Sequence, residues 1–341
     1  MLAGGRGSRM RPLTDDCPKP LLPVGDRSLL QRQLNDLAAL GATRVVVAAG
    51  YRAADLHSAF PDHRSPAGGP DGAPSRPEVR VVREARPLGT GGGLREALTE
   101  VRDADAVLVL NGDLLTGHDL AAQVRALQEA DDEVLAVVHV REVADARPYG
   151  SVVLGPDDRV TAFVEKSDTP PARTINAGTY VVRPALRERI PDGAVSLERE
   201  VFPSLAAEGR LHGHREDADF LDVGNPAALV RANQQVVRAG GAEALVLPGA
   251  QVHPDAVLTG GSVVHPGARV GAGARLDGAV VLPEAVIGTG CLVARSVIGL
   301  QAELGEDASV IDAALGTGVR IAPGAQVRDA LLPDPVAAPG R

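Results

Sequence analysis

Aliphatic residues recur at every sixth position in the C-terminal part of the chain, beginning near Leu247. The series soon becomes a set of triplets, each offset by 17 residues from the one before. A hexapeptide period is typical of a parallel β-helix, in which every coil carries three short strands. We therefore expect a left-handed parallel β-helix here. The series opens with Val252 and Leu258, and the triplets are Val264/Val270/Leu276, Val281/Ile287/Val293, Ile298/Leu304/Val310 and Leu315/Ile321/Val327.

Two residue types inside this repeat could be taken for catalytic groups. Cys291 stands four positions after an aliphatic residue, in a slot that is otherwise filled by small residues, so we expect it to pack in the stack. His253 and His265 fall at equivalent points of the repeat and could suggest the base of an acyltransferase. Nothing like a coenzyme A site accompanies them, and we expect both at solvent-facing turns. The other slots hold Ala256, Ser262, Ala268, Ala274 and Ala285.

The preceding two thirds of the chain alternate between strand-like and helix-like patterns. Ser28 and Gln31 form a capping box ahead of a helix, and Gly41 stands where that helix should end. Runs of β-branched residues at 44–50 and 79–82 predict buried strands. This alternation favours an α/β domain with a Rossmann-like, mostly parallel sheet. One face of the helix carries Leu30, Leu34 and Leu37.

Later segments continue the pattern. Residues 106–115 form an apolar strand that ends in Asn111-Gly112-Asp113, where ligands collect in open α/β sheets. We also expect a helix beginning near Leu94, a hairpin at residues 149–153 and 160–166, a strand opened by Asn176-Ala177-Gly178, and a mobile surface loop at residues 61–78.

The change from alternating strand and helix patterns to the hexapeptide period divides the chain into parts. We expect an α/β domain at residues 1–235, a linker at 236–250, the β-helix at 251–330 and a tail at 331–341. A β-helix leaves its ends and faces available for self-association, so we expect a homo-oligomer.

Composition excludes several classes of function. A net charge of −9, with 2% aromatic residues and no Trp, argues against nucleic acid as a partner. The two cysteines lie too far apart for a disulfide framework, which fits a reducing compartment. No apolar run is long enough for a membrane span, and no signal peptide is visible, so we expect a cytoplasmic protein without a membrane partner.

Against this acidic background, one basic and glycine-rich stretch stands out near the start. Residues 2–14, LAGGRGSRMRPLT, place bare backbone beside cations, and a triphosphate needs both. The stretch lacks the spacing of a Walker A motif. Lys19 and Lys166 are the only lysines among 35 basic residues. Because Arg and Lys differ where a compact ammonium is required, we interpret both lysines as chemically constrained.

LAGGRGSRMRPLT followed by PKPLLPV resembles the signature of the sugar-1-phosphate nucleotidyltransferases, the nucleotide-sugar pyrophosphorylases. Further motifs match in the family's order: PLGTGG, which looks like the mannose-type guanylyltransferases, V-E-K at residues 164–166, N-A-G at 176–178 and FLDVGNP at 220–226. Asn225 departs from the pattern, since Thr is commoner there. Only Met1 precedes Leu2, whereas members normally carry several apolar residues before this point, so we expect the true start to lie upstream.

The resemblance implies roles for individual residues. Arg9, Lys19 and Asp113 would be catalytic, and Asp113 and Asp222 would bind Mg²⁺ through carboxylate oxygens. The implied nucleotide-binding residues are Leu2, Ala3, Gly4, Gly5, Gly7, Ser8, Arg9, Gly89 and Thr90. The implied sugar-phosphate-binding residues are Gly150, Glu165, Lys166, Asn176 and Gly178.

The resemblance also implies a reaction: a nucleoside triphosphate and a sugar 1-phosphate give a nucleotide sugar and pyrophosphate. GTP and mannose 1-phosphate are favoured. A guanylyltransferase or thymidylyltransferase acting on another hexose or cyclitol 1-phosphate stays open, as do UTP as the nucleotide, a catalytically silent regulatory subunit, and a second acyl-transfer activity in the β-helix.

Overall fold

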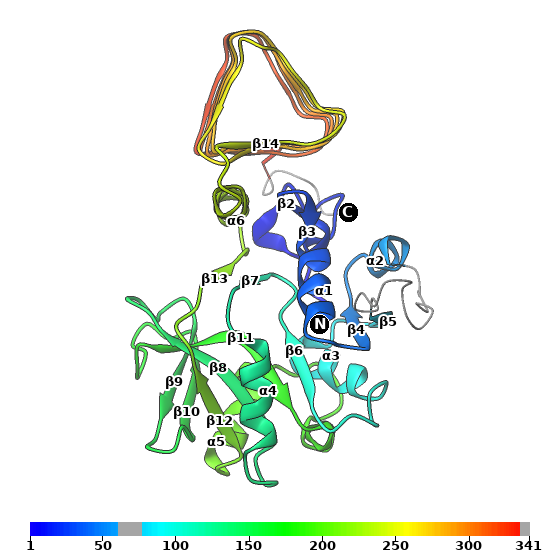
Figure 1. The fold of residues 1–341 in the computed structure, drawn as a ribbon, viewed down its shortest axis with the longest axis vertical. Coiled ribbons are helices and arrows are strands. Elements are labelled where there is room, and N and C mark those ends of the chain that lie inside the picture. The colour runs from blue at the N-terminus through cyan, green and yellow to red at the C-terminus, as the bar shows by residue number, and fades with distance from the viewer. Residues whose placement is uncertain (61–76, 335–341) are drawn as a thin grey trace. The chain divides into compact units, whose positions relative to one another are not determined.

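The computed structural model describes residues 1–60 and 77–334, so all but the last two residues of the expected loop at 61–78 and the end of the expected tail lie outside the described residues. The chain folds as two compact units. The first comprises Met1–Gly5 and Arg32–Phe220, and the second comprises Arg6–Gln31 and Leu221–Arg341 (Figure 1). The segment after Gly5 therefore belongs with the C-terminal part of the chain.

Two sheets form the core of the first unit. The three-stranded sheet is parallel and consists of β1 (Leu2–Ala3), β4 (Arg44–Ala49) and β5 (Glu78–Arg83). The larger sheet consists of β6 (Val107–Leu110), β8 (Ala136–Glu142), β9 (Gly150–Leu154), β10 (Val160–Glu165), β11 (Thr174–Val182) and β12 (Leu211–Arg215). The expected α/β class is confirmed. In the larger sheet, however, only β8 and β12 pair in parallel among the described strands, because hairpin connections such as β9–β10 produce antiparallel neighbours.

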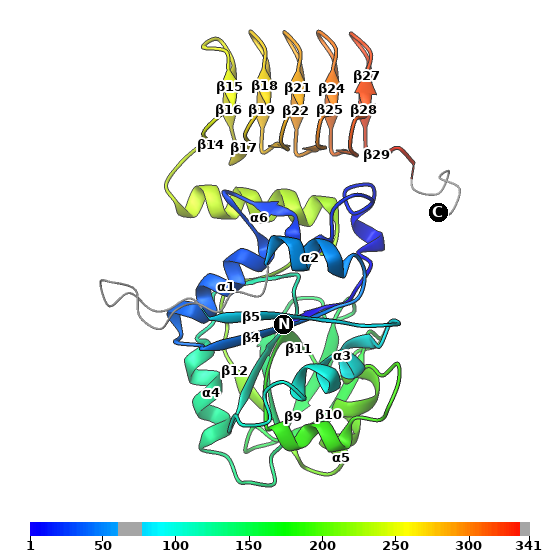
Figure 2. The same cartoon turned by 90° about the vertical axis from the view of Figure 1, so that its right-hand side faces the viewer.

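Helices and short elements complete this part of the chain (Figure 2). Among the described helices, none combines the length and apolar character that a membrane-spanning helix needs. The helices are α1 (Leu29–Ala39), α2 (Ala53–Ala59), α3 (Gly89–Leu98), α4 (Leu120–Gln128) and α5 (Phe202–Ala207), with shorter turns η3 (Pro184–Arg189) and η4 (Leu197–Val201) and the short strands β7 (Leu114–Thr116) and β13 (Phe220–Asp222).

The predicted ends of α1 are confirmed. The Gln31 N–H donates to Ser28 Oγ at 3.2 Å, as a capping box requires. At the other end, Gly41 takes a φ of 87° and its N–H donates to the Ala38 carbonyl. Ala42 closes the helix by donating to the Leu37 carbonyl, which completes a Schellman motif.

The predicted start of α3 near Leu94 is wrong, because the helix begins at Gly89. Low helix propensity is overridden by close packing. A Cβ on Gly89 would lie 2.5 Å from the Val195 carbonyl oxygen, and one on Gly92 would lie 2.4 Å from that of Gly193. The Gly91 N–H also donates to the Val195 carbonyl at 2.8 Å. The glycines are therefore the first turns of the helix, pressed against a neighbouring segment.

The predicted strand opened by residues 176–178 begins earlier, at Thr174. Asn176-Ala177-Gly178 lies inside β11, where the register toward β8 shifts between Asn176 and Tyr180. Gly178 has a φ of 76° at this irregularity. A bulge of this kind redirects side chains out of the sheet alternation.

The second unit contains a parallel β-solenoid, which confirms the expected β-helix. Figure 1 shows its triangular outline and Figure 2 its stacked coils. One sheet is formed by β14 (Ala244–Val246), β17 (Ser262–Val264), β20 (Val280–Val281), β23 (Val297–Ile298), β26 (Ala314–Leu315) and β29 (Leu331–Leu332). The second is formed by β15 (Gln251–Val252), β18 (Arg269–Val270), β21 (Val286–Ile287), β24 (Glu303–Leu304) and β27 (Arg320–Ile321). The third is formed by β16 (Val257–Thr259), β19 (Arg275–Asp277), β22 (Leu292–Ala294), β25 (Ser309–Ile311) and β28 (Gln326–Arg328).

The aliphatic triplets pair in the register that the sequence predicts. Val264 lies opposite Val281, and Val281 lies opposite Ile298 in the next coil. The small-residue slots are buried in the interior except for Ala256, which is partly buried, and Cys291 has no exposed surface. Burial raises the pKa of the Cys291 thiol, and its Sγ lies 3.0 Å from the Gly305 carbonyl oxygen. The packing role expected for Cys291 therefore fits its surroundings.

The expected solvent-facing position is wrong for His265. His253 is exposed, but His265 is only 4% exposed, and burial lowers its pKa to about 4. His265 directly follows β17, whose sheet packs against α6 (Pro226–Ala239). A neutral, buried imidazole does not provide the surface base that acyl transfer to a soluble acceptor would require.

The remaining elements of the second unit are a short hairpin and two 3₁₀ turns. The hairpin consists of β2 (Pro23–Val24) and β3 (Arg27–Ser28), and the turns are η1 (Ser8–Met10) and η2 (Lys19–Leu21). Helix α6 extends into the stretch predicted as a linker. The boundaries proposed for the domains stay a prediction.

Strand β1 is short, and a cavity of about 620 Å³ lies beyond its start. The Met1 amine donates to the Val46 carbonyl at 2.8 Å, in the place of a ladder amide. Burial lowers the pKa of this amine from 8.0 to about 5. The cavity extends between β4 and β6, and its lining includes Val45, Val46, Leu98, Val107, Val109 and Val124. Its walls suit an extended apolar segment.

We predict that four apolar residues placed ahead of Met1 stabilise the fold by roughly 2–4 kcal/mol, because they bury side chains in this cavity. The chain that starts at Met1 should also lose stability as pH falls from 8 toward 5, since only the unfolded amine gains a proton in that window. Urea denaturation at several pH values measures both effects. A Gly-Ser extension of equal length should also remove the pH dependence caused by the amine. It should not raise the free energy of unfolding, because it buries no apolar side chains. Equal stability of the two extensions would contradict this prediction.

Candidate active site

The unit boundary divides the predicted site residues into two groups. The second unit carries Gly7, Ser8, Arg9, Lys19 and Asp222. The first unit carries the remaining ones, which are Leu2, Ala3, Gly4, Gly5, Gly89, Thr90, Asp113, Gly150, Glu165, Lys166, Asn176 and Gly178. Each group has its own internal geometry.

In the second unit, Gly7 brings Lys19 and Thr14 together. Gly7 has a φ of 62° and precedes η1. A Cβ on Gly7 would lie 3.1 Å from Thr14 Cγ2 and 3.3 Å from Lys19 Cβ. Thr14 Oγ1 donates to the Gly7 carbonyl at 2.9 Å. Both the backbone angle and the lack of space therefore require glycine, and they hold Lys19 beside the glycine-rich turn.

Arg9 and Asp222 converge on Gly224. A Cβ at this glycine would lie 3.2 Å from Asp222 Oδ1 and 3.4 Å from Arg9 Nη2. Asn225 follows as the N-cap of α6, because its Oδ1 accepts the Ala228 N–H at 2.9 Å. Asn caps a helix as well as Thr does, so this departure from the family pattern keeps the local structure.

In the first unit, Asp113 belongs to a turn between β6 and β7 that a buried side chain holds in place. The Gln33 Nε2 donates to the carbonyls of Asn111 at 2.9 Å and Leu114 at 3.0 Å. The Gly112 N–H donates to the Leu2 carbonyl at 2.9 Å. The Asp113 turn is thus fixed to α1 and to the strand that opens the glycine-rich signature.

Glu84 lies among three glycines of the same unit. A Cβ on Gly4 would lie 2.6 Å from Glu84 Oε1, and Cβ atoms on Gly50 and Gly93 would also come within 3.1 Å of its carboxylate. Burial raises the pKa of Glu84, while the hydrogen bond that it accepts from the Leu88 N–H at 3.2 Å opposes this shift. A partly buried carboxylate therefore stands beside the predicted nucleotide-binding glycines.

A chain of hydrogen bonds connects the predicted nucleotide and sugar residues. Thr90 Oγ1 donates to Glu198 Oε2 at 2.6 Å, and the Tyr180 hydroxyl donates to Glu198 Oε1 at 3.2 Å. The Asn176 Nδ2 donates to the same Tyr180 hydroxyl oxygen at 3.0 Å. Asn176 also accepts the Gly178 N–H at 2.9 Å. Glu198 thereby sets the relative positions of Thr90 and Asn176.

Glu165 and Lys166 end β10 close to Gly150. Lys166 Nζ lies 3.6 Å from Glu165 Oε1, and a Cβ on Gly150 would lie 2.8 Å from Glu165 Oε2. Burial raises the pKa of Glu165; Lys166 opposes this shift and the nearby Glu198 adds to it. Lys166 has a φ of 48°, a conformation that costs energy for a side chain other than Gly. Such strain is typical of positions held for function.

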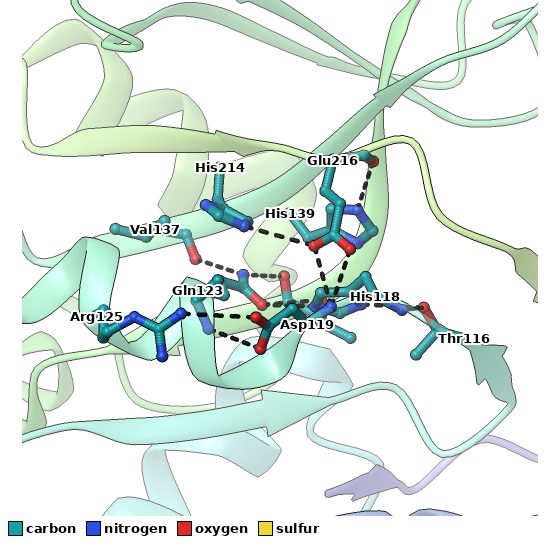
Figure 3. A network of polar contacts seen from close by, with 11 residues as sticks. Thr116, His118, Asp119, Gln123, Arg125, Val137, His139, His214 and Glu216 are labelled. Atoms are coloured by element: carbon teal, nitrogen blue, oxygen red, sulfur yellow. Dashed lines mark hydrogen bonds and ion pairs between the residues drawn. The ribbon is translucent and has the colours of Figure 1, made fainter.

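A separate cluster of histidines lies around the start of α4 (Figure 3). The rings of His118 and His139 stack with centroids 3.9 Å apart. Burial lowers the pKa of His118, and it lowers that of His139 to about 4, so both are neutral near pH 7. The Glu216 carboxylate accepts the Asp119 N–H at 3.0 Å and lies 3.6 Å from His214. We interpret this cluster as structural support for the segment that follows β7.

Two of the predicted site residues, Asp113 and Asp222, carry the oxygen ligands that a hard cation prefers. Within residues 1–60 and 77–334, no group of three or more His, Cys, Asp or Glu side chains forms a metal cage. Mg²⁺ commonly takes one or two carboxylates and completes its coordination with phosphate oxygens and water. Asp113 and Asp222, which belong to different units, each offer a carboxylate of the kind that Mg²⁺ takes.

Comparison with known proteins identifies the family. Residues 1–239 match the family model described as "Nucleotidyl transferase", and residues 241–334 match the "GMPPB C-terminal domain". The chain belongs to the nucleotidyl transferase family. The motifs that suggested this family are therefore supported over most of the chain.

Similar proteins include enzymes and a solved structure. A mannose-1-phosphate guanylyltransferase of Mycobacterium tuberculosis is 39% identical, over 82% of this chain and 77% of that protein. A probable mannose-1-phosphate guanylyltransferase 1 of Oryza sativa is 31% identical, over 81% and 78%. The crystal structure of HddC from Yersinia pseudotuberculosis complexed with GMP-PN superposes with a TM-score of 0.56 at 26% identity, over 69% of this chain and 97% of that one.

Sequence reasoning missed three residues that organise these groups: Gln33, Glu84 and Glu198. Gln33 sits on the predicted helix as one polar residue among several, and only its burial distinguishes it. Glu84 lies five positions before Gly89, so an acid close to a predicted ligand loop was the signal that could have identified it. Glu198 lies in a short π-helical turn, which no hydrophobic periodicity of the sequence predicts.

Proposed function

We propose that the chain transfers the guanylyl group of GTP to mannose 1-phosphate and releases pyrophosphate. The observation that carries this proposal is the 39% identity to a mannose-1-phosphate guanylyltransferase over 82% of the chain. The approach of Arg9 and Asp222 to Gly224, and of Lys19 to the glycine turn, is consistent with a polyphosphate ligand. A cytoplasmic location, where GTP is available, stays a prediction.

In the proposed reaction, a phosphate oxygen of the sugar 1-phosphate attacks the α-phosphorus of the nucleotide in line. The new bond joins that oxygen to the α-phosphorus, and the bond from the α-phosphorus to the bridging oxygen of pyrophosphate breaks. Arg9 and Lys19 neutralise the triphosphate and the charge that develops on the leaving pyrophosphate. Backbone N–H groups of Leu2, Ala3, Gly4, Gly5, Gly7 and Ser8 complete the phosphate and nucleoside contacts.

Asp113 and Asp222 are proposed to hold Mg²⁺. When bound, the ion supplies charge neutralisation at the phosphate oxygens. The proposal requires the two groups of residues to face the same nucleotide, and the variants below test that requirement.

Sugar binding is assigned to the first unit. Lys166 orients the attacking phosphate, while Glu165 and Asn176 bind sugar hydroxyls, with Gly150 and Gly178 providing space. The connection from Asn176 through Tyr180 and Glu198 to Thr90 keeps the sugar and nucleotide subsites in register. Gly89 and Thr90 face the nucleoside.

Glu84 is proposed to read the base. A carboxylate accepts hydrogen bonds from N1–H and the 2-amino group of guanine together, and neither thymine nor uracil offers that pair of donors. The position of Glu84 against Gly4 and Gly93 places it beside both glycine-rich segments. This argument favours GTP over dTTP and UTP.

Self-association through the β-helix is kept as a proposal, because exposed apolar residues such as Val257 and Leu292 stand on the third solenoid sheet. A silent regulatory subunit would be expected to lose some of the charged positions, and all of them are present. The buried state of His265 gives no support to acyl transfer in the β-helix.

The substrate assignment predicts the outcome of a matrix of GTP, dTTP and UTP against mannose, glucose and cyclitol 1-phosphates. GTP with mannose 1-phosphate should give the highest kcat/KM, measured by pyrophosphate release. A higher value for another pair would replace this assignment while keeping the family reaction. No release with any pair would favour the regulatory subunit.

Lys19→Ala and Asp113→Ala should each lower kcat/KM by roughly 100-fold or more, because each removes charge compensation at the reacting phosphates. Lys19→Arg should recover little, since a planar fork does not replace a compact ammonium. The control is Arg27→Ala, which removes an exposed cation of the β2–β3 hairpin and should stay within about twofold of the parent. Near-parental rates for both Lys19→Ala and Asp113→Ala would refute the mechanism.

Glu84→Gln should reduce the preference for GTP over ITP, which lacks the 2-amino group. We expect the ratio of the two kcat/KM values to fall about tenfold, because a neutral amide offers one acceptor where the carboxylate offers two. Glu96→Gln, an exposed acid on the same helix as the glycines, is the matched control. An unchanged ratio in Glu84→Gln would assign base recognition to other groups.

A further inference from the structure

One sheet of the solenoid is apolar on its outer face as well as its inner face. From β17 to β26 the outward positions of this sheet are almost completely buried, whereas the equivalent positions of the other two sheets are mostly charged, polar or exposed. At the two ends of the sheet, Leu245 is half-buried and Leu331 is exposed. The buried outward residues are Val263, Val280, Val297 and Ala314. Their exposed counterparts include Arg269, Glu303, Arg320, Arg275 and Leu292. Burial of a solenoid face requires a covering structure, since a free face would expose these side chains.

Helix α6 covers the first coils of this sheet. A Cβ on Gly261 would lie 2.7 Å from the Gln234 Cα, and one on Gly278 would overlap the Gln234 side-chain amide. Helix α6 also packs on β14 and β17. These contacts account for the beginning of the covered face, but Ala314 lies at its other end.

At that other end, the segment between Arg9 and Lys19 is in contact with the solenoid. A Cβ on Gly316 would lie 3.0 Å from Pro12 Cβ, 3.3 Å from Pro12 Cγ and 3.3 Å from the Leu332 carbonyl oxygen. Gly316 has no positive φ, so its backbone does not demand glycine. Its lack of a side chain is explained by space.

Gly316 belongs to a column of residues that follow the strands of this sheet at the 17-residue spacing. His265, Leu282, Gly299 and Gly316 follow the covered strands and are buried, whereas Pro333 follows β29 and is exposed. The last two of the four buried members are glycines. Pro12 itself is buried, as are Met10 and Leu13 on either side of it.

A second attachment ties the same segment to α6. The Gly25 N–H donates to Asn233 Oδ1 at 2.7 Å, and Asn233 Nδ2 donates to the carbonyls of Pro23 at 3.2 Å and Leu229 at 2.9 Å. Asn233 has no exposed surface. The hairpin that follows Lys19 is therefore anchored on the helix that covers the solenoid.

We propose that the solenoid positions the triphosphate-binding cations, and that Gly316 and Asn233 are positioning residues for residues 6–31. This inference rests on the proposed function for the roles of Arg9 and Lys19. Pro12 seated on Gly316 fixes the segment on one side of Lys19, and the hairpin held by Asn233 fixes it on the other. The β-helix thus contributes to nucleotide binding without touching the substrate.

The test uses the full chain with Gly316→Ala and Gly316→Val, which push Pro12 outward by increasing amounts. The KM for GTP should rise about threefold in Gly316→Ala and tenfold or more in Gly316→Val, because small displacements of charged groups have large effects on a polyphosphate site. The KM for the sugar 1-phosphate should stay within about twofold, since its proposed ligands lie in the first unit. Gly155→Ala is the matched control, because a Cβ there meets nothing closer than 3.4 Å.

Hydrogen exchange supplies a second readout that does not depend on activity. Amides of residues 6–22 should exchange faster in Gly316→Val than in the parent or in Gly155→Ala, while the melting temperature confirms that the variant is folded. Unchanged exchange, together with an unchanged KM for GTP, would overturn the proposal that the contact of Pro12 with Gly316 positions this segment. If exchange is faster in Gly316→Val while the parent releases no pyrophosphate with any substrate, the contact of Pro12 with Gly316 is kept and the proposed function is rejected instead.

Discussion

Buried backbone carbonyl groups need hydrogen-bond donors. Two side-chain amides provide such donors, one at the turn that contains Asp113 and one at the hairpin that follows Lys19. Gln33 supplies donors to both ends of the Asp113 turn. Asn233 supplies a donor and an acceptor to the hairpin that follows Lys19. Neither amide is exposed, so neither is available to a ligand. The Asp113 turn and the β2–β3 hairpin thereby gain fixed positions from side chains of α1 and α6.

A second constraint is the close approach of backbone to backbone, which fixes where glycine can stand. In α3 the glycines admit the carbonyl groups of Val195 and Gly193. In the solenoid, Gly288 admits the Leu304 carbonyl of the next coil, within 2.7 Å of where a Cβ would be. These positions show the same principle in two architectures, because the absence of a side chain determines which elements can pack together.

Most of the fold could be predicted because it rests on local, repeated signals. The hexapeptide period depends on inward aliphatic residues in every coil, and the capping of α1 by Ser28 and Gly41 depends on residues adjacent in sequence. The start of α3 could not be predicted, since its glycines are stabilised as a helix by a segment about a hundred positions away. The exposure predicted for His265 was wrong for a related reason. It depends on what covers one sheet, and the inward aliphatic residues are the same whether the outer face is covered or free.

The site shows the same division. Motifs identified charged residues that would touch a ligand, because such residues recur at fixed spacings. Gln33, Glu84 and Glu198 act through tertiary contacts with no spacing rule, so their sequence neighbours look ordinary. The outward valines at 263, 280 and 297 were the sequence signal for a covered face. Apolar residues at successive outward positions of one sheet would form an exposed apolar patch if nothing covered them.

The assignment of residues 6–31 to the C-terminal unit has a consequence for protein engineering. A chimaera that exchanges only the solenoid would join the proline-containing segment of one parent to the coils of another. Pro12 and Gly316 would then come from different ancestors, and a bulkier residue at either position would mismatch. Functional exchange between relatives of this kind should therefore transfer two stretches that are distant in the gene, residues 6–31 and 221–334, as one block.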